Sequence, residues 1–247
     1  MRTRKELTPR GTIYGVEDVI AFVRDDLRNG ETAKPVAALE TGLSATIAGI
    51  ASNTAVYQPE ALPEANGTVV TNHLKAPFRS AHKPLLAEAR TVAEADAKAR
   101  QPGPLSDAAF ESRFVQGIAV LDGPKRIAAV QNLTFEQSSA LVRHGDIARL
   151  DLPHRIIADV WERHMLLGYL ARTGSQADYG AKPSFDNPLA VGADQDAAMA
   201  AVRPQLAAFR AKAERVKLAG ELLQGVVRLA AAATGKSVDA IWAEWTA

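Results

Sequence analysis

The sequence predicts a mainly α-helical fold with one small β-hairpin. Apolar residues recur at steps of three and four over several long stretches, which is the period of a helix that buries one face. Branched aliphatic residues, which are typical of strands, are concentrated near residues 115–133. The chain has 247 residues, of which 47% are hydrophobic and 23% charged, so it is long enough to bury a core and is not disordered throughout.

Two helices are expected near the N-terminus. Residues 15–29 place their apolar side chains on one helical face, and Asn29-Gly30 supplies a stop signal after them. Residues 35–52 predict a second, buried helix, in which Gly42 and Gly49 let another backbone approach closely. Residues 53–84 are expected to form a long irregular connection, because prolines and an Asn-Gly pair interrupt them.

An alanine-rich helix with alternating charge follows over residues 85–100 and ends at the tetrapeptide Gln-Pro-Gly-Pro, residues 101–104. This tetrapeptide is the best candidate for a domain boundary. We therefore expect an N-terminal helical region, residues 1–100, with an extended loop at 53–84. Residues 105–247 are expected to form a C-terminal, mainly helical region, and a single domain is the alternative.

The start of the C-terminal region is expected to combine short helices with the hairpin. Ser106 can cap a helix that runs to residue 113. The runs 115–121 and 126–135 flank a turn-forming tetrapeptide, which favours a β-hairpin, although a helix through the same residues is the alternative. Thr134 and Gln137 have the spacing of a capping box, which predicts a helix from there to residue 143.

Two longer helices are expected in the rest of the chain. The first follows Pro153, has a broad apolar face and runs to residue 172. Residues 173–192 are rich in Gly and Pro and predict a second long loop. Asp194 can cap the next helix, which Pro204 either kinks or restarts and which continues for about thirty residues to a stop at residues 234–235.

A final short helix, begun by Ser237, carries Trp242 and Trp245. Large rigid aromatic side chains near a chain end are costly to leave in water and are over-represented at interfaces. Both tryptophans are therefore candidate interface anchors. The alternative is that both cap the protein's own core.

The sequence carries no motif that identifies an enzyme. It contains no cysteine, which excludes disulfide scaffolds, thiolate nucleophiles and cysteine metal sites, and no serine lies in a Gly-x-Ser-x-Gly elbow. Residues 230–237 resemble a relaxed phosphate-binding loop, but such a loop needs a preceding strand, which the pattern does not predict here. A helix that ends at Gly235 explains the same residues, and no cofactor is predicted.

The histidines have no spacing suited to a metal site. His154 and His164 are separated by a helical rotation about 80° from a whole number of turns, so they do not share a face, and no metal is predicted. Should an active site be assembled from distant segments, the region to search contains His144, His154, Asp159 and His164. Asp159 is more simply explained as part of the solvated side of an amphipathic helix.

Lys75, Arg79 and Lys83 lie in the only sustained basic stretch and are candidate contacts for an anion such as a nucleic-acid backbone. The formal net charge of the whole chain is only +1, with 29 Lys and Arg against 28 Asp and Glu. No global field therefore attracts polyanions, and nucleic acid is not the favoured partner.

One segment resembles part of a known family. Residues 15–24, followed by Asn29-Gly30, Pro35 and the Ala/Gly-rich stretch to Ser52, are similar to the closing helices of glucose-fructose oxidoreductase-type dehydrogenases. That family's Gly-x-Gly-x-x-Gly dinucleotide turn is absent from this sequence, as is a βαβ half before the segment. The resemblance therefore implies neither a cofactor site nor catalytic residues.

These observations favour a non-enzymatic structural or assembly protein, a subunit of a larger complex or particle that contacts other subunits or copies of itself. Two long connections, a long C-terminal helix and the lack of a convergent polar cluster support this function. The alternatives are an enzyme, with a weak oxidoreductase relationship, and a nucleic-acid-associated assembly factor. No signal peptide or membrane span is visible, so we expect the protein in the cytoplasm or within an assembled particle.

Overall fold

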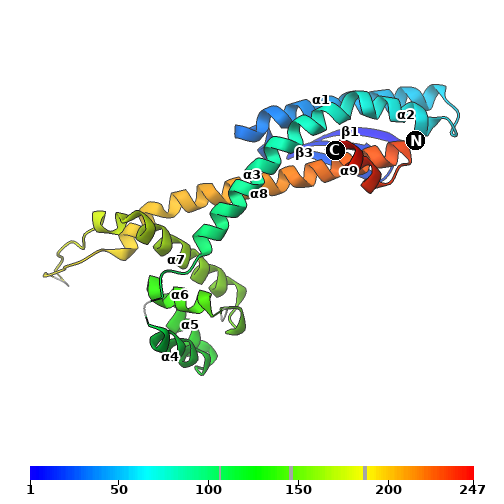
Figure 1. Ribbon diagram of the computed structural model, residues 1–247. Helices are drawn as coiled ribbons and strands as arrows, with labels where there is room; N and C mark the ends of the chain where they lie inside the picture. Colours follow the sequence, from blue (N-terminus) through cyan, green and yellow to red (C-terminus); the bar gives the residue numbers. More distant parts are fainter. Residues whose placement is uncertain (106, 145–146, 186–187) are drawn as a thin grey trace. The chain divides into compact units, whose positions relative to one another are not determined.

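The fold is mainly α-helical with one small antiparallel sheet, which confirms the predicted class (Figure 1). The computed structural model describes residues 1–105, 107–144, 147–185 and 188–247. The chain forms two compact units: unit 1 contains Met1–Val92 and Ala211–Ala247, and unit 2 contains Ala93–Arg210. The expected regions 1–100 and 105–247 differ from these units chiefly in where residues 211–247 belong.

Unit 1 begins with a three-stranded meander, in which β1 (Thr3–Thr8), β2 (Gly11–Val16) and β3 (Val19–Arg24) pair antiparallel in sequence order. The predicted helix over residues 15–29 is therefore wrong. Val16 pairs with Val19 across a tight turn, and Glu17 in that turn has a φ of 50°. Residues 25–28 form only a short 3-10 turn, η1 (Asp25–Arg28).

The burial of β3 shows why the helical interpretation failed. In β3, Ala21 and Val23 are buried, whereas Ile20 is 42% exposed and Phe22 is only partly buried. Burial thus alternates with the period of a strand. The buried face packs on helices: the Tyr14 hydroxyl lies 3.1 Å from Ser44 Oγ, and a Cβ at Gly225 would lie 3.0 Å from the Ala21 Cα. A short run of apolar residues fits both periods, and this packing selects the strand.

Three helical segments follow the sheet. The predicted helix at 35–52 is confirmed as α1 (Ala33–Val56). The expected irregular connection at 53–84 is wrong, because it contains α2 (Leu62–Val70), a π-helical turn, η3 (Thr71–Lys75), and the first part of α3 (Ala76–Arg100). Pro63 occupies the first turn of α2, where a proline is tolerated, and Pro84 lies inside α3 beside the buried Leu85. Burial of the apolar face outweighs the local cost of the proline.

Unit 2 contains the end of α3, then α4 (Ala108–Ala119), α5 (Gly123–Gln131), α6 (Phe135–Arg143), α7 (His154–Thr173) and the start of α8 (Gln195–Thr234). The hairpin predicted near 115–133 is wrong, and the alternative of helices there is right. Asp122 caps α5 by accepting the Lys125 backbone N–H at 3.0 Å, so the supposed turn is a helix start. Branched residues such as Val115 and Val130 are buried between helices instead.

Local signals for helix ends are confirmed in several places. Thr134 and Gln137 form the predicted capping box at the start of α6. Asp194 accepts the Ala197 backbone N–H before α8, and Ser237 caps α9 (Val238–Thr246). Asp107 caps α4, whereas Ser106, predicted for that role, lies outside the described residues.

The helix α8 continues through Pro204 without restarting and is 40 residues long. Its N-terminal part belongs to unit 2 and its C-terminal part to unit 1, and the other division between the units falls inside α3. Among the described helices, none is long and apolar enough to cross a bilayer.

We expect Gly42→Ala to lower the free energy of unfolding by about 1–3 kcal/mol, because its Cβ would lie 2.3 Å from the His73 carbonyl oxygen. Gly67→Ala in α2 is the matched control, since its Cβ meets no atom within 4 Å. That change should stabilise the protein by about 0.5–1 kcal/mol through helix propensity. Urea unfolding measures the free energy of unfolding, which should decrease for Gly42→Ala and increase for Gly67→Ala. An unchanged value for G42A would contradict the close approach of α1 to η3.

Candidate functional site

The four residues proposed as a search region for catalysis do not converge. His154 and Asp159 are exposed on α7, and His164 is buried on the same helix. His144 follows α6, and its side chain is partly exposed. No hydrogen bond or ion pair joins any two of these four described residues. The described part of the chain also contains no group of three or more His, Asp or Glu residues that could hold a metal ion.

His164 has a structural environment. Its Nδ1 lies 2.9 Å from Ser138 Oγ, and its Nε2 lies 3.2 Å from the Gln101 carbonyl oxygen. Burial lowers the pKa of the His164 ring, which favours the neutral form. In that form the Gln101 carbonyl requires the proton on Nε2, which leaves Nδ1 as an acceptor. The single hydroxyl hydrogen of Ser138 then has two acceptors, His164 Nδ1 and the Phe135 carbonyl oxygen at 3.0 Å.

The Ser138–His164 contact has the atom types of a nucleophile and a base. Both side chains are fully buried, which leaves no access for a substrate. The hydroxyl of the neighbouring Ser139 accepts the Gly103 backbone N–H at 2.9 Å. Contacts between α6 and α7 could not be read from sequence spacing.

A second buried polar contact joins Glu111 of α4 to Arg143 of α6. Arg143 also donates to the Gly103 carbonyl oxygen, and the second carboxylate oxygen of Glu111 lies 3.4 Å from His144 Nε2. The tetrapeptide 101–104 is thus tied to α6 and α7 by His164, Ser139 and Arg143. These polar groups position a connection and do not face a common cavity.

Two of the three predicted anion contacts, Lys75 and Arg79, have partners within the chain. Lys75 Nζ lies 2.8 Å from Glu244 Oε1, and the Arg79 guanidinium donates to the Trp245 and Glu244 carbonyl oxygens, each at 3.0 Å. Hydrogen bonds from Lys75 and Lys236 lower the pKa of Glu244. Lys75 and Arg79 therefore attach α9 to the rest of unit 1, while Lys83 is exposed.

The motif that resembles a phosphate-binding loop is a helix junction. Gly235 has a φ of 68° at the end of α8, a left-handed conformation that glycine adopts at little cost. The Lys236 ammonium lies 3.1 Å from Glu244, and Ser237 caps α9. The interpretation of these residues as a helix end is confirmed.

The two candidate interface tryptophans have different environments. Trp245 is 2% exposed and belongs to the core of unit 1, whereas Trp242 is 41% exposed. The Trp242 ring makes edge contacts with Phe78 and His82, at centroid distances of 5.9 and 5.3 Å. Trp242 lies at the edge of a cavity of about 210 Å³, here called the Trp242 groove, whose other lining residues are His82, Leu85, Leu86, Ala89, Val216, Gly220, Leu223 and Gln224.

Between α7 and α8, unit 2 has an exposed apolar loop, described for residues 179–185 and 188–194. Two backbone hydrogen bonds close its base, from Ala181 N to Gly192 O at 2.8 Å and from Asp194 N to Tyr179 O at 2.7 Å. Phe185, Leu189 and Val191 lie between them, almost completely exposed. The expectation of a loop over residues 173–192 holds for the described part, apart from Thr173, which ends α7, and the 3-10 turn η5 (Ser175–Asp178).

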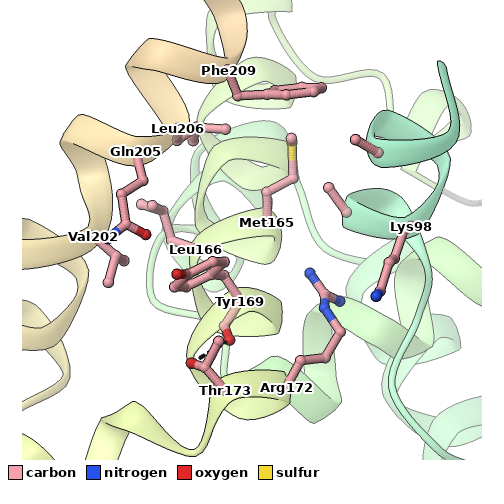
Figure 2. Close-up of a pocket in the computed structure, with 12 residues that line it drawn as sticks. Lys98, Met165, Leu166, Tyr169, Arg172, Thr173, Val202, Gln205, Leu206 and Phe209 are labelled. Carbon is pink, nitrogen blue, oxygen red and sulfur yellow. Dashed lines mark hydrogen bonds between the residues drawn. The ribbon is translucent and has the colours of Figure 1, made fainter. Parts of the chain in front are cut away.

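A larger cavity, of about 430 Å³, lies within unit 2 and is here called the α3–α7–α8 pocket (Figure 2). Its walls are mainly apolar, and Figure 2 shows Lys98 of α3 and Arg172 of α7 together at one side. No residue of the sequence-based site prediction lines it, because its walls come from segments far apart in the chain. The lining residues are Ala95, Lys98, Ala99, Met165, Leu166, Tyr169, Arg172, Thr173, Val202, Gln205, Leu206 and Phe209.

Comparison with protein families, curated proteins and solved structures found no match to this chain. The segment at residues 15–52 that resembles the closing helices of a dehydrogenase family therefore matches no family model. Its first part also forms strands and not a helix.

The depressed pKa of His164 predicts a pH dependence of stability. Above pH ~6.5 the ring is neutral in both folded and unfolded chains, and below it the unfolded chain takes up the proton first. Stability should therefore fall as pH decreases from ~6.5 towards the folded pKa, and His164→Gln should remove this part of the slope. Thermal unfolding across this range tests it, with His154→Gln, exposed on the same helix, as the control. Equal slopes in wild type and H164Q would contradict the burial of a neutral ring.

We expect Arg143→Met to destabilise unit 2 by about 3–5 kcal/mol, because it leaves the Glu111 carboxylate buried without its cation. Arg100→Met is the matched control. Arg100 pairs with Asp96 on the surface, where such a pair contributes at most about 1 kcal/mol. Hydrogen exchange of amides in α4 and α6 measures the difference, and equal effects in the two variants would show that Glu111 is adequately solvated.

Proposed function

We propose that this chain is a non-enzymatic subunit of a protein assembly, and that it associates with a second copy of itself through the Trp242 groove. The observation that carries the proposal is a partly exposed tryptophan at the edge of an apolar cavity. Tryptophans next to apolar pockets are typical of the anchor residues that dominate binding energy at protein interfaces. The proposal places the chain within an oligomer or a larger particle.

The Trp242 side chain is preorganised for such a contact. Edge contacts with Phe78 and His82 hold the indole ring, so little rotamer freedom is lost when a partner covers it. Leu86 adds apolar surface at the groove and is about equally exposed. Gly220 leaves space there, since a Cβ at this position would meet no atom within 4 Å.

A second copy is the partner of choice because electrostatic repulsion between copies is weak. The formal net charge is only +1, and most soluble oligomers are built from identical chains. The exposed apolar loop at residues 179–194 supports the assembly role independently, because Phe185, Leu189 and Val191 would lose contact with water in a complex.

The alternatives receive less support from the described residues. The residues proposed for catalysis do not meet, and two of the three candidate anion contacts, Lys75 and Arg79, already bind groups of α9. Neither an enzyme nor a nucleic-acid-binding factor has a specific site that favours it here.

Trp242→Ala should weaken self-association by about 30-fold or more, the loss of a typical hot-spot residue, while the helical content stays unchanged. Sedimentation velocity over a range of concentrations measures this. Tyr57→Ala is the matched control, because Tyr57 is 48% exposed in unit 1 and does not line the groove. A wild-type chain that remains monomeric at every concentration would overturn the proposal, as would equal weakening by Y57A.

A further inference from the structure

The α3–α7–α8 pocket combines an apolar body with two cations that have no acidic partner among the described residues. Met165, Leu166 and Val202 are buried at its wall, and Leu206 and Phe209 extend the apolar surface along α8. The alanines of α3 are small, which leaves space between this helix and α7. Its volume of about 430 Å³ falls within the range of small-molecule sites, roughly 300–1,000 Å³.

Lys98 and Arg172 are the charged residues of this pocket, and no acidic residue is among the described residues that line it. Neither cation has a carboxylate within ion-pair distance in the described part of the chain. Nearby cations that do not line the pocket are paired: Arg100 with Asp96, and both Arg203 and Arg210 with Glu162. Lys98 and Arg172 thus differ from these three neighbours, whose charges are neutralised by carboxylates.

The ends of two helices reduce this positive charge without cancelling it. Lys98 lies in the last turn of α3 and Arg172 in the last turn of α7, where each helix terminus carries about half a negative charge. Two full positive charges against about one negative charge leave the region net positive. Burial lowers the pKa of Arg172, and the guanidinium stays protonated.

We propose that the α3–α7–α8 pocket binds a small carboxylate that carries an apolar chain or ring. The carboxylate accepts hydrogen bonds from the Arg172 guanidinium and the Lys98 ammonium, and the apolar part lies against Met165, Leu166 and Phe209. The site is distinct from the Trp242 groove, all of whose lining residues belong to unit 1.

Three probes of equal chain length and different charge test the proposal: octanoate, 1-octanol and octylamine, each below the concentration at which it aggregates. Isothermal titration with the full chain should show saturable octanoate binding, with 1-octanol weaker by about tenfold or more and octylamine weaker still. Equal affinities for octanoate and 1-octanol, or no saturable octanoate binding, would overturn the proposal.

Two variants locate the binding. Lys98→Gln/Arg172→Gln should reduce octanoate affinity to the level of 1-octanol and leave 1-octanol unchanged, whereas Arg203→Gln/Arg210→Gln, the matched control outside the pocket, should change neither. Ala95→Trp/Ala99→Trp fills the cavity and should reduce binding of both probes. Circular dichroism confirms that each variant is folded, and octanoate binding that survives both the charge-removing and the filling variant would refute this site.

Discussion

Unit 1 depends on one constraint: the C-terminal part of α8 is a helix that must be buried on nearly every side. Over residues 218–234 the exposed positions are Glu221, Gln224 and Arg228, whose spacing of three and four residues confines them to one stripe. The remaining surface cannot stay in water, so the sheet, α1, α3 and α9 are arranged against it. Gly225 allows a close approach of β3, because a side chain at this position would meet the Ala21 backbone.

The elements that could be predicted from the sequence are those decided by local signals. Signals that act within one turn, such as Thr134 with Gln137, Asp194, Ser237 and Gly235, are correct because a few adjacent backbone groups decide them. The strand β3 could not be predicted in this way. Its apolar residues fit a helix equally well, and the choice is made by Ala21 packing against α8, far along the chain. The prolines in residues 53–84 predicted an irregular connection for a similar reason. Tertiary burial stabilises helices there that local propensity disfavours.

The candidate sites show a similar division. Residue type alone makes both Trp242 and Trp245 candidate interface anchors. The two side chains are about 60° apart around α9, and only that of Trp245 points into the core of unit 1. The α3–α7–α8 pocket was not identified, because Lys98 and Arg172 come from distant helices and neither belongs to a motif. In unit 2 the buried His164 and the partly buried Arg143, which pairs with the buried Glu111, fix the path of residues 101–104. Polar side chains here specify a connection.

The discontinuity of unit 1 has a consequence for how the protein is made. A chain is synthesised from its N-terminus, so the sheet and α1 leave the ribosome long before residues 211–247. Those residues include the part of α8 against which the sheet and α1 pack. Unit 2 is continuous in sequence and has all its residues while unit 1 is still incomplete. During translation α1 can already pack on the meander, but the part of the sheet that lies on α8 is still without its native cover.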